Sequence, residues 1–459
     1  MTEVNNEAPV NGINVNTKNR PQKFYKTYTY GCQMNENDTE RLAGQLKSLG
    51  FNETETKEQA DVIIINTCCV RESAEKKIYG KIGELKRLKA EKPNLVIGIA
   101  GCMAQKDRDK LFKKAPHIDF VIGTHNVHQL KDLLNEVGRS REKVLAVWDQ
   151  AERLAPEVPT IRKNKIAAWV PIMYGCNNFC TYCIVPYVRG RERSRPAEDI
   201  MKELAELGAA GFKEVTLLGQ NVNSYGKDGD NYPDFADLLT IADEAEHIER
   251  IRYMTSHPRD MNDKVIAAIK NSKKICEHFH LPIQSGSDAI LQKMNRGYTS
   301  DYYRALVKQI RLAVPQASLT TDLIIGFPGE TEQTFEETLQ LLKEIEFDAA
   351  YTFLYSQRSG TPASTMPDQI PQAVKKDRLN RLAEVQNEIS LSINKRLIGI
   401  TVEVLVEGES KNNPDKLMGR TRTNKIVIWD KTGKESIGQL VHVEIEIAQT
   451  WLLKGRLVD

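Results

Sequence analysis

The stretch IAAWVPIMYGCNNFCTYCIV, residues 166–185, joins a mostly apolar run to a loop with three cysteines. The first ten residues are typical of a buried strand, and Cys176, Cys180 and Cys183 follow in a C-x3-C-x2-C pattern. Structural zinc takes four ligands, but no histidine follows before His247, far downstream, so the loop lacks a nearby fourth ligand. An iron–sulfur cluster uses the same thiolate chemistry. A 4Fe–4S cluster on three cysteines would keep one iron free for a substrate or cofactor.

The sequence around this loop alternates between strand and helix patterns from 166 to 392. Strands are expected at 166–175, 214–221, 250–257, 278–286, 318–330 and 348–360. Helical patterns separate them, for example at 197–208 and 331–345. Six such units are too few for an eight-fold barrel, so we predict a partial (β/α)6 barrel. Sites in barrels lie at the carboxyl ends of the strands, which is where the cysteine loop falls.

The region upstream, predicted as a domain at 23–148, shows the same alternation. Strands are expected at 26–32, 61–68, 94–102 and 120–123. Helical patterns such as 38–49 and 72–90 lie between them. These features predict an α/β domain with a parallel sheet and helices on its faces.

Three of these upstream strand runs end in a cysteine, at Cys32, Cys68 and Cys102. Parallel strands end at one edge of a sheet, so the three thiols are expected to meet there as a second three-thiolate site. The alternative is three buried cysteines, which is common for this residue type. Cys69 complicates the prediction, because adjacent strand residues point to opposite faces and only one of Cys68 and Cys69 is then a ligand. Periodicity does not choose between them.

The two ends of the chain and the link between the α/β regions have different patterns. Past the barrel, 393–459 shows short strands with Gly and Asn turns, which predicts a small all-β barrel domain. The polar, proline-containing stretch 149–165 is predicted to be a linker. The asparagine-rich segment 1–22 is predicted to be a disordered tail.

Composition excludes several classes of protein. The net charge is only +2 over 459 residues, so RNA binding would have to come from local basic patches. No apolar run approaches the roughly 20 residues that span a bilayer, and the first residues lack a secretory signal. We therefore predict a cytoplasmic protein with no membrane partner. Its eight cysteines are then metal ligands or buried thiols rather than a disulfide framework.

A three-cysteine loop after the first strand of a partial barrel resembles the radical S-adenosylmethionine (SAM) superfamily. The order of an N-terminal domain with three cysteines, this barrel and a small β domain is similar to the methylthiotransferases. Four stretches and a final TRAM-type domain resemble their tRNA branch; the stretches are YGCQMNENDTE (30–40), NTCCVRE (66–72), LLGQNVNSYG (217–226) and LPIQSGSDAILQKMNRGYT (281–299). The resemblance covers nearly the whole chain after the tail. Its NTC motif falls on Cys68 rather than Cys69.

The resemblance implies two 4Fe–4S clusters and two equivalents of SAM per turnover. One cluster binds SAM on Cys176, Cys180 and Cys183, and an auxiliary cluster lies on Cys32, Cys68 and Cys102. The implied activity is methylthiolation of carbon 2 of N6-isopentenyladenosine at position 37 of tRNA, in the anticodon stem-loop. A cluster-bound sulfur is methylated by SAM, and a 5′-deoxyadenosyl radical then activates the base for sulfur insertion. An external electron donor and a monomer are expected, and no catalytic side chain beyond the cluster ligands.

Other polar residues near the strand ends are candidates for binding. SAM contacts are expected from Gln220, Gln284 and Ser285, although an ordinary polar loop explains them equally well. Arginines just past the cysteine loop suit tRNA phosphates or the SAM carboxylate. In the last domain, clustered cations would suit tRNA phosphates. The RNA-binding candidates are Arg189, Arg191, Arg193, Arg195, Arg420, Arg422 and Lys425. Solvated charged faces are the alternative.

Two kinds of rival remain open. The same chemistry acts, in related branches, on threonylcarbamoyladenosine in tRNA or on an aspartate of a ribosomal protein. A zinc-bearing RNA-binding protein without catalysis is the rival from another class. Iron and acid-labile sulfide in anaerobically purified protein separate the enzyme from the zinc protein.

Overall fold

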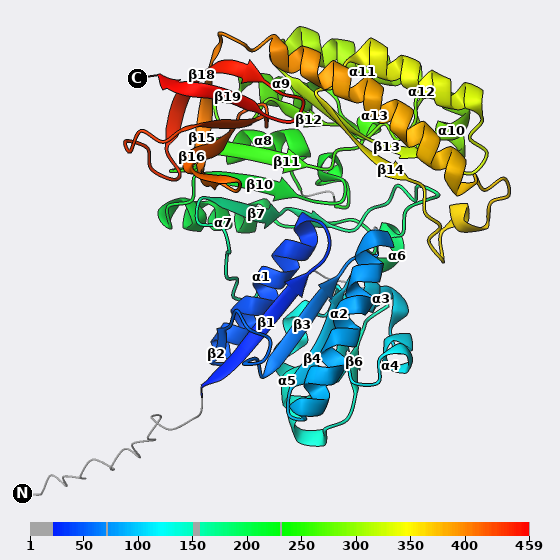
Figure 1. The fold of residues 1–459 in the computed structure, drawn as a ribbon, viewed down its shortest axis with the longest axis vertical. Coiled ribbons are helices and arrows are strands. Elements are labelled where there is room, and N and C mark those ends of the chain that lie inside the picture. Colours follow the sequence, from blue (N-terminus) through cyan, green and yellow to red (C-terminus); the bar gives the residue numbers. More distant parts are fainter. Residues whose placement is uncertain (1–21, 70–71, 150–156, 230–231, 459) are drawn as a thin grey trace, which may run out of the picture.

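The computed structural model describes residues 22–69, 72–149, 157–229 and 232–458, with the side chains of 72–76 excepted. The predicted tail therefore lies outside the described residues apart from residue 22, as do residues 150–156 of the predicted linker. Three folded units follow one another along the described chain (Figure 1). None of its described helices is long and apolar enough to cross a membrane.

The N-terminal unit is a parallel sheet of six strands in the order β2-β1-β3-β4-β5-β6. The strands are β1 (Lys23–Thr29), β2 (Phe51–Glu53), β3 (Val62–Thr67), β4 (Val96–Gly101), β5 (Phe120–Ile122) and β6 (Val144–Ala146). The four strands predicted from the sequence correspond to β1, β3, β4 and β5. Strands β2 and β6 were not predicted, because three residues at a sheet edge show no usable periodicity.

Helices cover both faces of this sheet. They are α1 (Gln33–Ser48), α2 (Glu72–Glu91), α3 (Cys102–Asp107), α4 (Lys110–Lys114) and α5 (Leu130–Ser140). Along β3, Ile63 and Ile65 pack into the core with α2, α3 and α4, whereas Val62 and Ile64 pack into the core with α1 and α5. Burial on both faces explains why this strand reads as a continuous apolar run.

The central unit is an open parallel barrel of six strands in chain order. The strands are β7 (Ala167–Pro171), β10 (Glu214–Leu218), β11 (Arg250–Met254), β12 (His278–His280), β13 (Ser318–Ile325) and β14 (Ala349–Leu354). Two three-stranded sheets are joined by a parallel bridge between Ile251 and Ile275. This confirms the predicted partial (β/α)6 barrel.

Helices follow the barrel strands on the outside, and one long helix leads out of the barrel. The helices are α6 (Val185–Arg189), α7 (Ala197–Ala209), α8 (Phe235–Ala242), α9 (Asp263–Asn271), α10 (Asp288–Lys293), α11 (Ser300–Ala313), α12 (Glu332–Ile345) and α13 (Gln372–Lys395). Two short strands, β8 (Met173–Tyr174) and β9 (Arg193–Ser194), pair on either side of the cysteine loop. They close that loop at its base.

The C-terminal unit is a closed barrel of five strands in the order β15-β16-β17-β19-β18, as predicted. Its strands are β15 (Thr401–Ser410), β16 (Asn413–Thr421), β17 (Ile426–Asp430), β18 (Leu440–Ala448) and β19 (Leu453–Val458). Trp429 and the valines of β15 and β18 fill its interior. Closure leaves no free strand edge, which allows so small a core to be stable.

The C-terminal barrel docks at the amino ends of the central strands. Arg250, the first residue of β11, is fully buried and donates to the Arg420 carbonyl at 2.6 Å and to the Glu403 carboxylate at 2.7 Å. Arg422 pairs with Glu277, just before β12, at 2.8 Å. The cysteine loop lies beyond the carboxyl end of β7. The C-terminal barrel and the cysteine loop therefore lie at opposite ends of the central strands (Figure 1).

Replacing Arg250 with alanine is expected to loosen this docking. The change removes the guanidinium and leaves the Arg420 carbonyl without that donor. We expect a loss of about 2 kcal/mol, below the value for a fully buried pair because Glu403 is 35% exposed. Urea unfolding would measure it, and faster hydrogen exchange in 401–430 would locate it. Arg456→Ala is the control, since that arginine is 62% exposed in its pair with Glu444; an equal loss there would contradict the prediction.

Candidate functional site

The loop with three cysteines is held in a fixed shape by its own backbone. Gly175 has a φ of +78°, and a Cβ there would lie 2.0 Å from the Arg191 carbonyl oxygen, so the turn requires glycine. Its N–H donates to the Gln220 side-chain oxygen. The Cys176 N–H donates to the Gly190 carbonyl at 3.1 Å, which folds the loop back on itself.

The three thiols of this loop lie in a mostly buried setting. Arg296 donates to the Cys180 sulfur at 3.3 Å and is anchored to the Pro282 carbonyl at 2.7 Å. Burial raises the pKa of Cys176 to about 11 and that of Cys183 to about 12. A bound cation is needed to hold such thiols as thiolates at neutral pH.

The donor set fits an iron–sulfur cluster better than a single metal ion. Among the residues that the structure describes, no three His, Cys, Asp or Glu side chains converge closely enough to hold one ion. A four-iron cluster is wider than one ion and spreads its thiolates further apart. The loop offers three sulfurs with Arg296 beside them, and thiolates are the ligands that such clusters take.

The second set of cysteines lies at the carboxyl edge of the N-terminal sheet. Cys32 precedes α1, Cys68 follows β3, and Cys102 begins α3 directly after β4. Gly101 has a φ of +91°, and a Cβ there would lie 2.3 Å from the Asn66 side-chain oxygen. Glycine is therefore required at the turn that brings Cys102 to the edge.

Arg189, from α6 of the barrel, reaches into this second site. It forms a buried ion pair with Asp38 of α1 at 2.7 Å. Burial works to lower the pKa of Arg189, but Cys102, Asp38 and Cys32 raise it well above its usual range. The same guanidinium hydrogen-bonds the Cys102 thiol and attracts the charge of Cys32. It acts as a link between the two units, and the structure gives no support to its predicted contact with tRNA.

Cys69 also lies against the second site. A hydrogen bond from the Cys69 thiol lowers the pKa of Cys102 to about 6, against the opposing effect of burial. Cys69 belongs to the apolar core on the α2 side of the sheet. Contact alone therefore does not exclude Cys69, and the assignment of Cys68 as the ligand remains a prediction.

Exchanging each of these neighbouring thiols for alanine separates the two assignments. We expect Cys68→Ala to lose the auxiliary cluster, leaving about four irons of about eight. Cys69→Ala should keep both clusters, because its side chain packs in the apolar core and alanine is tolerated there. Iron and acid-labile sulfide per chain provide the measurement. Loss of iron in Cys69→Ala alone would reverse the assignment.

The residues predicted to contact SAM have different settings. Gln220 supports the cysteine loop through Gly175. Gln284 is buried with a φ of +76°, and its backbone pairs with β13. The Ser285 hydroxyl contacts Thr338 of α12 at 3.4 Å, on the helix side of the strand rather than at the rim. Contact with SAM stays a prediction for all three.

The remaining arginines after the cysteine loop are engaged within the chain. Arg191 stacks over the Phe179 ring at 4.4 Å, and Arg193 donates to the Arg189 carbonyl at 3.1 Å. Arg195 is buried and pairs with Glu203 at 2.7 Å. Arg193 and Arg195 have partners within the chain, whereas Arg191 is exposed. RNA contact by these three arginines stays a prediction.

The predicted RNA contacts of the C-terminal barrel are likewise engaged internally. Arg420 pairs with Glu407 at 3.2 Å, and Arg422 pairs with Glu277. Lys425 pairs with Asp348 and lies in the docking surface. Arg422 and Lys425 thus pair with the central barrel, while Arg420 pairs within the C-terminal barrel. Contact with tRNA stays a prediction for all three.

Sequence reasoning missed three residues of the site. Arg296 lies within one of the stretches that carry the family resemblance, yet its contact with Cys180 spans 116 positions. Asp38 lies in another of these stretches and in a predicted helix, but its pairing with Arg189 was not foreseen. Cys69 was weighed as a ligand against Cys68, but its hydrogen bond to Cys102 was not foreseen. A buried charge beside a thiolate leaves no local pattern, so only the fold could place these residues.

Comparisons with known proteins agree with this architecture. Residues 24–123 match Uncharacterized protein family UPF0004, residues 170–342 the Radical SAM superfamily, and residues 395–458 the TRAM domain. Among solved structures, the methyltransferase TsrM from Kitasatospora setae aligns with a TM-score of 0.54 at 12% identity, over 86% of this chain and 80% of that one. The cobalamin-dependent radical enzyme OxsB aligns with a TM-score of 0.52 at 14% identity, over 80% and 56%. These structural matches support the fold.

Curated relatives match over the full length. A protein of Desulforamulus reducens is 50% identical over 100% of this chain and 99% of its own, and one of Clostridium botulinum strain Loch Maree is 52% identical over 99% of each. A third, from Carboxydothermus hydrogenoformans, is 52% identical over 95% of this chain and 100% of its own. All three are named tRNA-2-methylthio-N(6)-dimethylallyladenosine synthase. With its two cysteine sets, its radical SAM barrel and its TRAM barrel, the chain belongs to this family of radical SAM methylthiotransferases.

Proposed function

We propose that this protein adds a methylthio group to carbon 2 of N6-isopentenyladenosine at position 37 of tRNA. The observation that carries the proposal is that α6, which begins two residues after Cys183, brings Arg189 beside Asp38 and Cys102 of the second cysteine set. The relatives' names favour the isopentenylated (dimethylallyl) base over threonylcarbamoyladenosine or a ribosomal protein aspartate.

Membership of the radical SAM family implies one 4Fe–4S cluster and SAM. Cys176, Cys180 and Cys183 would hold that cluster. When bound, the pair supplies a 5′-deoxyadenosyl radical, which is strong enough to remove the unactivated hydrogen from carbon 2 of adenine. The second cluster and the use of two SAM molecules are our proposal, with Cys32, Cys68 and Cys102 as the ligands.

The chain's own residues supply position, charge and exclusion of water. Gly175 and Gln220 fix the path of the cysteine loop. Arg296 donates to the Cys180 sulfur, and Arg189 lies beside Cys102; each cation offsets negative charge that thiolates bring into a buried site. Burial of the thiols keeps water away from the reacting atoms.

Nucleoside mass spectrometry of tRNA tests the proposal directly. Cells that lack this protein should accumulate N6-isopentenyladenosine, and restoring the chain should return the methylthio group to carbon 2. If the methylthio group persists without the chain, the proposed function is wrong. An external electron donor, a monomeric state and a cytoplasmic location remain predictions.

A further inference from the structure

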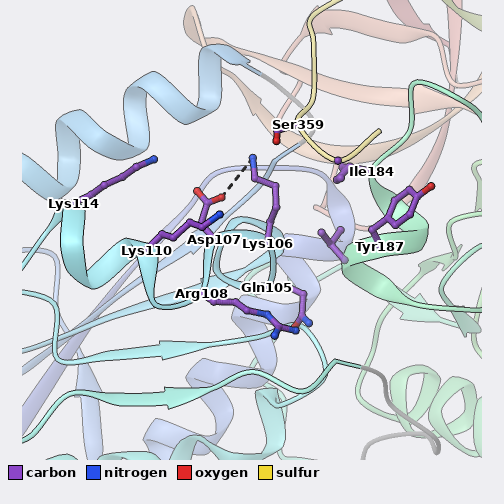
Figure 2. Close-up of a pocket in the computed structure, with 11 residues that line it drawn as sticks. Gln105, Lys106, Asp107, Arg108, Lys110, Lys114, Ile184, Tyr187 and Ser359 are labelled. Atoms are coloured by element: carbon purple, nitrogen blue, oxygen red, sulfur yellow. Dashed lines mark ion pairs between the residues drawn. The ribbon is translucent and has the colours of Figure 1, made fainter. Parts of the chain in front are cut away.

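A hollow of about 530 Å³ lies where the N-terminal unit meets the central barrel. Helices α3 and α4 line one side, and α6 with the loop after β14 lines the other (Figure 2). We call it the basic groove and define it by Lys106, Arg108, Lys110, Lys114, Tyr187 and Ser359. Neither cysteine set lines it, so it is separate from the site described above.

The groove concentrates positive charge in a chain that is almost neutral. Four cations and a single carboxylate, Asp107, line it, whereas the whole chain carries only +2. Lys106 contacts Asp107 at a loose 3.7 Å, and Arg108 pairs with Asp149, which is 84% exposed. The Arg108–Asp149 pair is solvent-exposed and contributes little free energy, so an incoming phosphate can replace Asp149. The Lys106–Asp107 pair is less exposed, but its length makes it a weak ion pair.

An aromatic side chain lies across the groove from these cations. Tyr187 of α6 is 48% exposed and points outward on the side opposite Lys110 and Lys114 (Figure 2). Its ring meets the Phe179 ring edge-on, with 5.9 Å between the ring centres. A cationic track beside an exposed aromatic ring is the combination that binds single-stranded nucleic acid.

The groove begins close to both cysteine sets. Lys106 lies four residues after Cys102 in α3, and thus on the same helix face. Tyr187 lies in α6, which begins two residues after Cys183. A strand lying in the groove would therefore pass within about one helical turn of each set.

We propose that the basic groove binds the phosphate backbone of the single-stranded anticodon loop of the tRNA substrate, with a base stacked on Tyr187. The proposal rests on the proposed function and names the surface that presents the target adenosine. It adds an RNA-binding surface beyond the predicted arginines, of which Arg195 and Arg422 are paired within the chain.

The first test removes charge from the groove in the reconstituted holoenzyme. We expect Lys106→Ala/Lys110→Ala to bind a synthetic isopentenylated anticodon stem-loop roughly tenfold more weakly, with the slope of log K against log salt reduced by about one to two. Lys113→Ala is the matched control, since that lysine lies on α4 between two groove lysines and is 79% exposed. Its affinity should stay at the wild-type value.

The second test addresses stacking without changing charge. Tyr187→Phe keeps the ring and should bind as wild type does, whereas Tyr187→Ala should weaken binding about tenfold with an unchanged salt slope. If both variants bind the stem-loop as tightly as wild type does, Tyr187 has no stacking role. If both variants lose affinity to the same extent, the effect belongs to the Tyr187 hydroxyl, which also contradicts the stacking role.

The outcomes separate this proposal from the proposed function. Iron content and SAM cleavage without RNA should be unchanged in every groove variant, which shows that they are folded. If wild type binds the stem-loop and Lys106→Ala/Lys110→Ala binds it equally well, the groove is excluded while the function stands. If wild type neither binds nor methylthiolates the stem-loop, the proposed function itself fails.

Discussion

Cys180→Ala is expected to abolish methylthiolation and SAM cleavage together. The Cys180 sulfur is the atom to which Arg296 donates, at 3.3 Å, and it belongs to the set proposed to hold the SAM-binding cluster. With two thiols the cluster is not retained, so no radical forms and the product should fall to the detection limit. Mass spectrometry of the tRNA and chromatography of 5′-deoxyadenosine measure the two losses.

Cys276→Ala is the matched control for that loss. Cys276 is also buried in the central barrel, but it precedes β12 at the amino ends of the strands, away from the cysteine loop. Its substitution should leave iron content and both products unchanged. Methylthiolated tRNA from the Cys180→Ala enzyme would show that Cys180 is not a ligand.

Cys102→Ala is expected to separate the two halves of the reaction. Cys102 begins α3 at the edge of the N-terminal sheet and is proposed to hold the auxiliary cluster. Its loss should leave about four irons per chain and continued SAM cleavage, but no methylthio group on tRNA. The barrel loop keeps its own contacts to Gly190 and Gln220, so its cluster should remain.

The same variant also tests whether the second site exists as an independent centre. Electron paramagnetic resonance of the reduced protein should show one cluster signal lost and one retained. Full iron content together with normal product would contradict the assignment of Cys102. Loss of all iron would mean that the two sites do not assemble separately.

The fold was predictable wherever strands are buried on both faces. β3 is a buried, mostly apolar run before NTC, and β13 is a mostly buried strand before GFPG, so these strands followed from the pattern. β2 and β6 are three residues each and could not be recognised. The docking of the C-terminal barrel depends on Arg250 and Glu403, which lie 153 positions apart. No local pattern carries such a contact.

The cysteines were proposed as ligands for a different reason than the cations were proposed to bind RNA. Thiols at strand ends are brought together by the topology of a parallel sheet, which periodicity reveals. Whether a cation is available to RNA depends on its partner in space: Arg195 is paired with Glu203 inside the chain, while Lys110 faces the groove. Sequence alone proposed Arg195, and not Lys110, as an RNA-binding residue.

The short helix α6 has a consequence for how this protein can be divided. Ile184 and Val188 follow the barrel's cysteine loop, yet they pack in the apolar core of the N-terminal unit with Met103 and Leu111. A central barrel cut off at residue 165 would keep Ile184 and Val188 but lose the apolar core that buries them. The separated N-terminal unit would have a cavity where these two side chains pack. The two units are therefore not interchangeable modules. A domain swap between relatives has to exchange α6 together with the N-terminal core that it packs into.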